Sequence, residues 1–127
     1  MQLSRELPDY AYTLRSADGR HARVNEHTLT RSFILSPDLL LDDWSVTAAA
    51  QLTAGDLARV LEQEPAVFLL GTGEHQVFPP AEIMAACLTR GIGIEVMNNA
   101  SAARTFNVLA SESRRVVAAF IVDAGGH

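Results

Sequence analysis

The chain has a single cysteine, Cys87, among its 127 residues. One cysteine cannot form an internal disulfide, so a scaffold held together by disulfides is excluded. Cys87 stands at helical spacing from Ile83, Met84 and Leu88, which predicts a buried, unreactive thiol. Residues 1–6 contain no apolar run of signal-peptide length, so we expect a soluble protein of a reducing, cytoplasmic compartment.

Long apolar runs and clusters of basic residues are also absent. No stretch approaches the roughly 20 apolar residues that cross a bilayer, so we expect no transmembrane segment. The chain carries 10 basic and 15 acidic residues, a formal net charge of −5. This charge repels nucleic acids and anionic membranes, and we expect neither as a partner.

Complete catalytic and cofactor motifs are missing. Gly71-Thr72-Gly73 lacks the third glycine of a dinucleotide fingerprint, and no Gly-Lys-Ser or Gly-Lys-Thr of a phosphate-binding loop occurs. The four histidines have neither ligand spacing nor cysteine companions, so we predict no metal site. No Gly-x-Ser-x-Gly motif occurs, and Cys87 has no evident histidine partner. We therefore expect no cofactor and no catalytic residue, and favour a protein that is not an enzyme.

What is present is the composition of one globular domain. Hydrophobic residues make up 48% and charged residues 20% of the chain, which is typical of folded proteins. A chain of this length buries about two-thirds of its extended surface on folding. We predict a single domain over residues 1–127, with residues 1–7 and 124–127 flexible.

The C-terminal half alternates strand and helix patterns. Residues 67–70 and 94–97 are short apolar runs typical of buried strands. Residues 116–122 form a longer run without a polar break, which predicts a central strand covered on both faces. Helices are predicted after Pro79-Pro80 and over residues 101–110. This order predicts right-handed crossovers on a mostly parallel sheet.

The N-terminal third indicates antiparallel strands. Alternation over residues 10–14, the turn pair Asp18-Gly19 and a partner at residues 20–24 are typical of a hairpin. A further strand is predicted at residues 31–35. The whole pattern predicts an α/β domain in which an antiparallel β portion precedes a mixed, mostly parallel sheet with flanking helices.

A helix is also predicted to begin after Thr53, where Asp56 completes a capping box, and to end near Glu64. Trp44 precedes this helix, and a side chain of its size is expected to pack in the core.

Two predicted strands end in polar turns that should lie near each other. Residues 71–73 follow the strand at 67–70, and Asn98-Asn99 follows the strand at 94–97. Ligands of open α/β sheets bind at the carboxyl ends of strands, and a helix N-terminus with Arg104 one turn in suits an anion. The candidate ligand-binding residues are Gly71, Thr72, Gly73, Asn98, Asn99, Ser101, Arg104 and Asn107.

The same residues have a structural interpretation, which we favour. The glycines permit a tight turn and the asparagines cap the helix. In this interpretation Arg104 pairs with a carboxylate such as Glu95 or Glu112.

Four segments of the chain carry a family resemblance. They are residues 32–37 with Trp44, residues 69–73, residues 91–97, and residues 104–109 followed by Glu112. Together they resemble the small α/β domains related to mitochondrial NADH dehydrogenase (complex I) assembly factor 3, which include uncharacterised bacterial members. The resemblance covers residues 32–122 and implies a three-layer α/β fold with a mixed central sheet.

The chain departs from this family at three places. Asn98-Asn99 stands where the family shows Asp-Thr, Phe106 where it shows Tyr, and Ser113 where it shows Gly. Loss of the aspartate removes a group able to act as an acid or to hold a cation, which weakens any catalytic interpretation of this turn.

The resemblance implies a non-enzymatic protein-interaction or respiratory-complex assembly-type factor with an unidentified protein partner. Its distinguishing feature would be an exposed apolar patch near Phe78 or residues 39–41. One alternative is a domain that binds a small anion or metabolite at the carboxyl ends of the parallel strands. This alternative covers an enzyme as well as a binding protein. Another is a homo-oligomeric scaffold.

Overall fold

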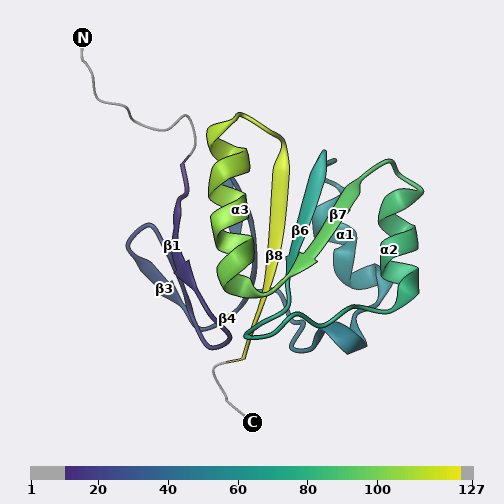
Figure 1. Ribbon diagram of the computed structural model, residues 1–127, viewed down its shortest axis with the longest axis horizontal. Coiled ribbons are helices and arrows are strands. Elements are labelled where there is room, and N and C mark those ends of the chain that lie inside the picture. The colour runs from purple at the N-terminus through teal and green to yellow at the C-terminus, as the bar shows by residue number, and fades with distance from the viewer. Residues whose placement is uncertain (1–10, 124–127) are drawn as a thin grey trace.

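The computed structural model describes residues 11–123 and arranges them in three layers around a five-stranded sheet (Figure 1). Four strands of this sheet run in one direction and β4 runs against them, because β4 pairs antiparallel with both of its neighbours. The predicted mixed, mostly parallel sheet is confirmed. Across the sheet the strands are β5 (Leu39–Leu41), β4 (Arg31–Ser36), β8 (Val116–Asp123), β6 (Val67–Gly71) and β7 (Gly93–Met97).

Strand β8 is the centre of the sheet, as its unbroken apolar run predicts. Every residue from Val116 to Val122 is buried, and β8 pairs with β4 on one side and β6 on the other. Ala118 and Ala119 let the covering layers approach closely, while Phe120 stacks on Phe33 of β4 at 5.0 Å between ring centroids. The strand therefore contributes to both hydrophobic cores.

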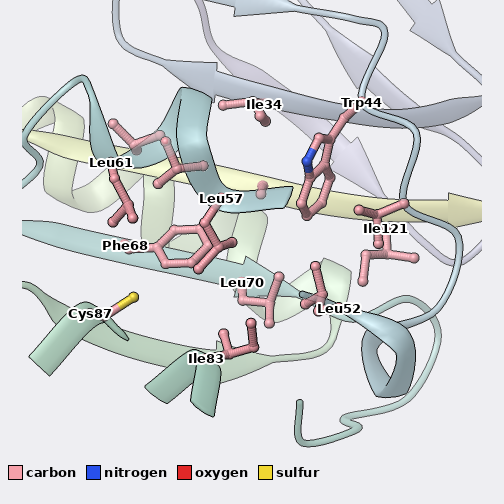
Figure 2. Packing of buried hydrophobic residues seen from close by; sticks show 14 of the residues in the cluster. Ile34, Trp44, Leu52, Leu57, Leu61, Phe68, Leu70, Ile83, Cys87 and Ile121 are labelled. Atoms are coloured by element: carbon pink, nitrogen blue, oxygen red, sulfur yellow. The ribbon is translucent and has the colours of Figure 1, made fainter. Parts of the chain in front are cut away.

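The first core lies between the sheet and the helices α1 (Ala58–Leu61) and α2 (Ala81–Leu88) (Figure 2). Trp44 is buried in it, and its indole Nε1 donates to the Asp56 carbonyl oxygen at 2.9 Å. Cys87 is also buried there, and burial raises the pKa of its thiol. Both side chains thus pack in the core, as predicted.

The second core lies on the opposite face of the sheet. It is covered by α3 (Asn99–Ser111) and by an antiparallel sheet of three short strands. Leu69 of β6 faces this core whereas its neighbours Phe68 and Leu70 face the first. The strands of the small sheet are β1 (Leu14–Ala17), β2 (Ala22–Val24) and β3 (His27–Leu29).

The small sheet departs from the prediction in two ways. Strand β1 begins only at Leu14, and Tyr10, like residues 1–7 and 124–127, lies outside the described residues. Strand β3 was not predicted, because the turn before it contains no glycine. Asn25 makes that turn with φ +52°, and its side chain accepts from the Thr13 N–H and donates to the Ala11 carbonyl. Asparagine tolerates this left-handed conformation better than most residues.

The helix predicted from Thr53 to Glu64 is much shorter in the structure. Asp56 accepts hydrogen bonds from the N–H and hydroxyl of Thr53, but the turn over Ala54–Leu57 is 3₁₀ (η2), and α1 ends at Leu61. Pro65 disfavours the helical conformation at Glu64, which instead adopts φ +50°. A further 3₁₀ turn, η1, spans Ala49–Gln51. Between residues 11 and 123, no helix has the length and apolarity needed to cross a bilayer.

Helices α2 and α3 end in the same left-handed motif. At the end of α2, Gly91 has φ +74° and the Ile92 N–H returns to the Cys87 carbonyl. At the end of α3, Ser113 has φ +60° and the Arg114 N–H returns to the Leu109 carbonyl. Glycine adopts this conformation without strain, whereas serine carries a Cβ penalty.

Replacing Ser113 with glycine is therefore expected to stabilise the domain. The free energy of unfolding, measured by urea denaturation, should rise by up to about 1 kcal/mol as the Cβ strain is relieved. Gly91→Ala is the matched control and should lower stability by about 1 kcal/mol. A loss of stability in Ser113→Gly would contradict the left-handed assignment.

Candidate functional site

The expected site lies at the edge of the central sheet where β6 and β7 end and α3 begins (Figure 1). The Thr72 N–H donates to the Met97 carbonyl, and the Asn99 N–H donates to the Gly73 carbonyl. The two strand exits therefore lie in direct contact, as predicted from their order in the sequence.

The Asn99 side chain is the junction of this edge. It is fully buried, its Oδ1 accepts from the Gly73 N–H at 3.0 Å, and its Nδ2 donates to the carbonyls of Asp18 at 2.8 Å and Ile121 at 3.0 Å. One carboxamide thus joins the start of α3 to the β6 exit, the β1–β2 turn and the end of β8. Both amide hydrogens and the carbonyl oxygen are used by backbone partners.

The end of β6 and the two residues after it are shaped by the same junction. A Cβ on Gly71 would collide with Asn99 Oδ1 and approach the Phe120 ring at 2.9 Å, so no larger residue fits there. Gly73 has φ +103°, a conformation that favours glycine. The buried Thr72 hydroxyl donates to the His75 carbonyl at 2.6 Å and accepts from the Val77 N–H at 3.0 Å.

The N-terminus of α3 is capped from within the chain. Asn98 Oδ1 accepts from the Ser101 N–H at 2.9 Å, and the Ala102 N–H bonds to the Asn98 carbonyl. With the bond from Asn99 to Gly73, three of the first four N–H groups of α3 have protein partners. The groups expected to hold an anion are therefore largely occupied.

Arg104 is exposed and donates from its guanidinium to Ser101 Oγ at 3.2 Å. Among the ion pairs formed within residues 11–123 none includes Arg104. The predicted pairing of Arg104 with Glu95 or Glu112 is therefore wrong. On an exposed helix surface, solvent already stabilises the guanidinium, and little is gained by pairing it.

Asn107 lies away from the strand exits and holds β1 against α3. Its Oδ1 accepts from the Leu14 N–H at 3.1 Å, and its Nδ2 donates to the Leu14 carbonyl at 2.6 Å. Asn107, Arg104 and Arg15 line a hollow of about 260 Å³ between α3 and β1. The eight candidate residues therefore form two groups: Gly71, Thr72, Gly73, Asn98 and Asn99 at the strand exits, and Ser101, Arg104 and Asn107 along α3.

Two carboxylates lie beside the strand exits. Backbone N–H groups of Arg20 and His21 donate to the Asp18 carboxylate and lower its pKa, so this exposed group stays ionised down to acidic pH. Glu74 Oε1 accepts from the Gly19 N–H at 3.4 Å. These negative charges oppose the binding of an anion at the strand exits. In the described part of the chain, no three side chains of His, Cys, Asp or Glu gather as metal ligands.

Sequence reasoning missed the long-range contacts that make these residues structural. Asp18 and Asn99 are 81 residues apart, and Leu14 and Asn107 are 93 apart. In both pairs an asparagine side chain binds a backbone group, so the identity of the distant residue carries no signal. Only the three-dimensional arrangement reveals such partners.

Replacing Asn99 is expected to destabilise the whole domain. Asn99→Ala leaves the buried Gly73 N–H, the buried Ile121 carbonyl and the half-buried Asp18 carbonyl without their partner. It should cost about 2–4 kcal/mol of unfolding free energy in urea denaturation. Asn98→Ala, which removes a helix cap, is the neighbouring control and should cost about 1 kcal/mol. Equal losses in the two variants would contradict the junction role of Asn99.

Asn99→Asp should make stability depend on pH. The introduced carboxylate, when ionised, would face the carbonyl oxygens of Asp18 and Ile121, which raises its pKa in the folded state above the unfolded value. The variant should therefore be most stable below about pH 4, where the group is protonated in both states, and should lose stability as the pH rises. Urea denaturation of this variant at pH 4 and pH 7 measures the difference, and equal losses relative to wild type at both values would contradict the account.

The chain is similar to proteins of known name and structure. It is 30% identical over 119 residues to NADH dehydrogenase [ubiquinone] 1 alpha subcomplex assembly factor 3 of Danio rerio, an alignment that covers 92% of this chain and 65% of that relative. This chain thus spans just under two-thirds of the length of that assembly factor.

Solved bacterial structures share the whole fold. A Xanthomonas campestris protein determined by NMR is 58% identical with a TM-score of 0.85, and the match covers 100% of this chain and 96% of that one. A Bordetella pertussis protein described as an Mth938-like domain is 27% identical with a TM-score of 0.79, covering 97% and 93%. A family model described as "Protein of unknown function (DUF498/DUF598)" matches residues 14–121. The chain belongs to this family.

Proposed function

We propose that this protein is a non-enzymatic interaction factor of the respiratory-complex assembly type, and that it acts by binding another protein. Its similarity to complex I assembly factor 3 along most of its length supports an assembly-type role. The polar groups at the strand exits support the non-enzymatic part, because they are hydrogen-bonded to the scaffold. The contact surface is inferred from exposed side chains.

The observation that carries the proposal is the exposure of Phe78. Its side chain is 66% exposed and the adjacent Val77 is 42% exposed, whereas the other four phenylalanines are fully buried. Aromatic residues, phenylalanine among them, are enriched at protein interfaces relative to the rest of the surface. Leu39, at 41% exposed, is the exposed member of the second predicted patch at residues 39–41.

The loop that carries Phe78 is anchored on both sides. The Val77 N–H bonds to the Thr72 hydroxyl, and Gln76 Nε2 donates to the Val96 carbonyl of β7 at 2.8 Å. On the other side Pro79 is buried and Pro80 leads into α2. A side chain held on an ordered loop loses little conformational entropy when it binds, which favours its use as a contact.

Phe78→Ser should remove partner binding without unfolding the domain. In an affinity pull-down from native lysate, with soluble and membrane fractions kept separate, wild type should recover a specific protein that Phe78→Ser loses at least tenfold. Leu88→Ser is the matched control, because Leu88 is 64% exposed and lies at the far end of α2. Recovery of the bait alone, or equal loss in both variants, would count against the proposal.

A second candidate function is the binding of a small anion or metabolite at the carboxyl ends of the parallel strands. The observation in its favour is Arg104, which is exposed near the N-terminus of α3 and engages only Ser101 among the described side chains. The residues at the strand exits would then shape the site and would not donate hydrogen bonds to the ligand. They are Gly71, Thr72, Gly73, Asn98 and Asn99.

This candidate predicts that Arg104→Ala weakens the ligand while the melting temperature stays within about 1 °C of wild type, as for most exposed substitutions. Phosphate, sulfate and nucleotides can be titrated into the labelled protein while the amide signals of Thr72, Asn99 and Arg104 are followed by NMR. Signals that stay unmoved in wild type would exclude the second candidate.

A further inference from the structure

Charge is distributed unevenly along this acidic chain. Residues 14–31, which form the small sheet and the start of β4, contain four arginines and two carboxylates, a net charge of +2. The whole chain carries −5, so the remaining residues carry −7. All ten basic residues are arginines, the side chain best suited to bind carboxylates through two parallel hydrogen bonds.

Three arginines from two distant parts of the chain are linked by a shared hollow and a shared carboxylate, and we call them the arginine row. Arg104 of α3 and Arg15 of β1 line the same hollow of about 260 Å³. Arg15 and Arg23 both contact the Glu26 carboxylate, each at 3.4 Å. The row therefore runs from Arg104 across the hollow to Arg15 and on to Arg23, with Glu26 between the last two.

The Glu26 contacts are weak and open to exchange. The Glu26 side chain is 75% exposed, and those of Arg15 and Arg23 are 56% and 50% exposed. Exposed pairs at this distance contribute little to stability, since water and salt screen them. A carboxylate from another molecule can therefore replace Glu26 at small cost.

We propose that this arginine row, Arg104, Arg15 and Arg23, is the docking surface for an acidic segment of a partner protein. The segment would lie in an extended conformation across the hollow, with its aspartates and glutamates on the guanidinium groups. Ala17, Ala100 and Ala103 line the hollow, and their small side chains leave room for the segment's methylene groups. This inference rests on the proposed function only in taking the partner to be a protein.

An acidic peptide fits better than a longer polyanion. A nucleic acid or a membrane extends well beyond the row and would meet the −7 carried by the rest of the chain. A short acidic segment places its charges only where the arginines are. A single phosphate would engage Arg104 and Arg15 at the hollow but leave Arg23 unused.

The test uses a hexaglutamate peptide as probe and the full chain at low salt. Dissociation constants are measured by calorimetry for wild type and for the variants Arg104→Gln, Arg15→Gln, Arg23→Gln and Glu26→Gln. Each arginine variant should weaken binding about threefold and Glu26→Gln should strengthen it about threefold, as expected for single exposed charges. Arg90→Gln is the control, because Arg90 is an exposed arginine after α2 on the other face of the sheet. This substitution should leave the dissociation constant unchanged. Circular dichroism checks that each variant is folded.

The outcomes separate this inference from its competitors. Absence of hexaglutamate binding, or equal weakening by Arg90→Gln, would overturn it. Binding of inorganic phosphate that depends on Arg104 but not on Arg23 would also overturn it. The same holds if anionic vesicles or an oligonucleotide, and not the peptide, bind with this dependence on the arginines. The Phe78 pull-down is independent: a partner captured there without hexaglutamate binding would refute the arginine row alone.

Discussion

The structure depends on one buried carboxamide. Asn99 binds Gly73, Asp18 and Ile121, which belong to three segments that are distant in the sequence. The large sheet, the small sheet and helix α3 are fixed relative to one another at this point. Asparagine suits the position because it offers two donors and an acceptor with no charge to bury. Aspartate would offer acceptors only, and alanine would leave three backbone groups unsatisfied.

The hydrogen bonds of Asn99 also determine what occupies the edge of the sheet where β6 and β7 end. The place where open α/β sheets commonly bind ligands is here filled by side chains that hold the fold. Gly71 has no Cβ because Asn99 and Phe120 occupy that space, and the Thr72 hydroxyl holds the following loop. That loop in turn presents Phe78 to solvent. The polar edge of the sheet therefore holds the loop that exposes an aromatic side chain.

Local pattern predicted much of this fold but little of its long-range organisation. The buried run of β8 and the capping role of Asn98 follow from short-range chemistry and were predicted. The end of α1 was misplaced because the effect of Pro65 on Glu64 outweighs helical periodicity. The turn at Asn25 lacked a glycine signal, so β3 was missed.

The candidate site shows the same division. Gly71, Thr72, Gly73, Asn98 and Asn99 could be predicted as neighbours, because the exits of adjacent parallel strands meet at one edge of the sheet. Their roles could not, because Asn99 and Asn107 bind backbone groups 81 and 93 residues away. Arg15 and Arg104 likewise become neighbours only when β1 packs beside α3. Surface charges that converge across such distances leave no motif in the sequence.

The most direct test of the protein-binding claim is site-specific photo-crosslinking in the native cells. A photoreactive residue is placed at position 78 and, in a separate variant, at position 88, which is exposed to nearly the same extent. If Phe78 lies at the contact surface, one discrete crosslinked protein is expected from position 78 and none from position 88. Identical products from both positions, or no protein product from position 78, would contradict it.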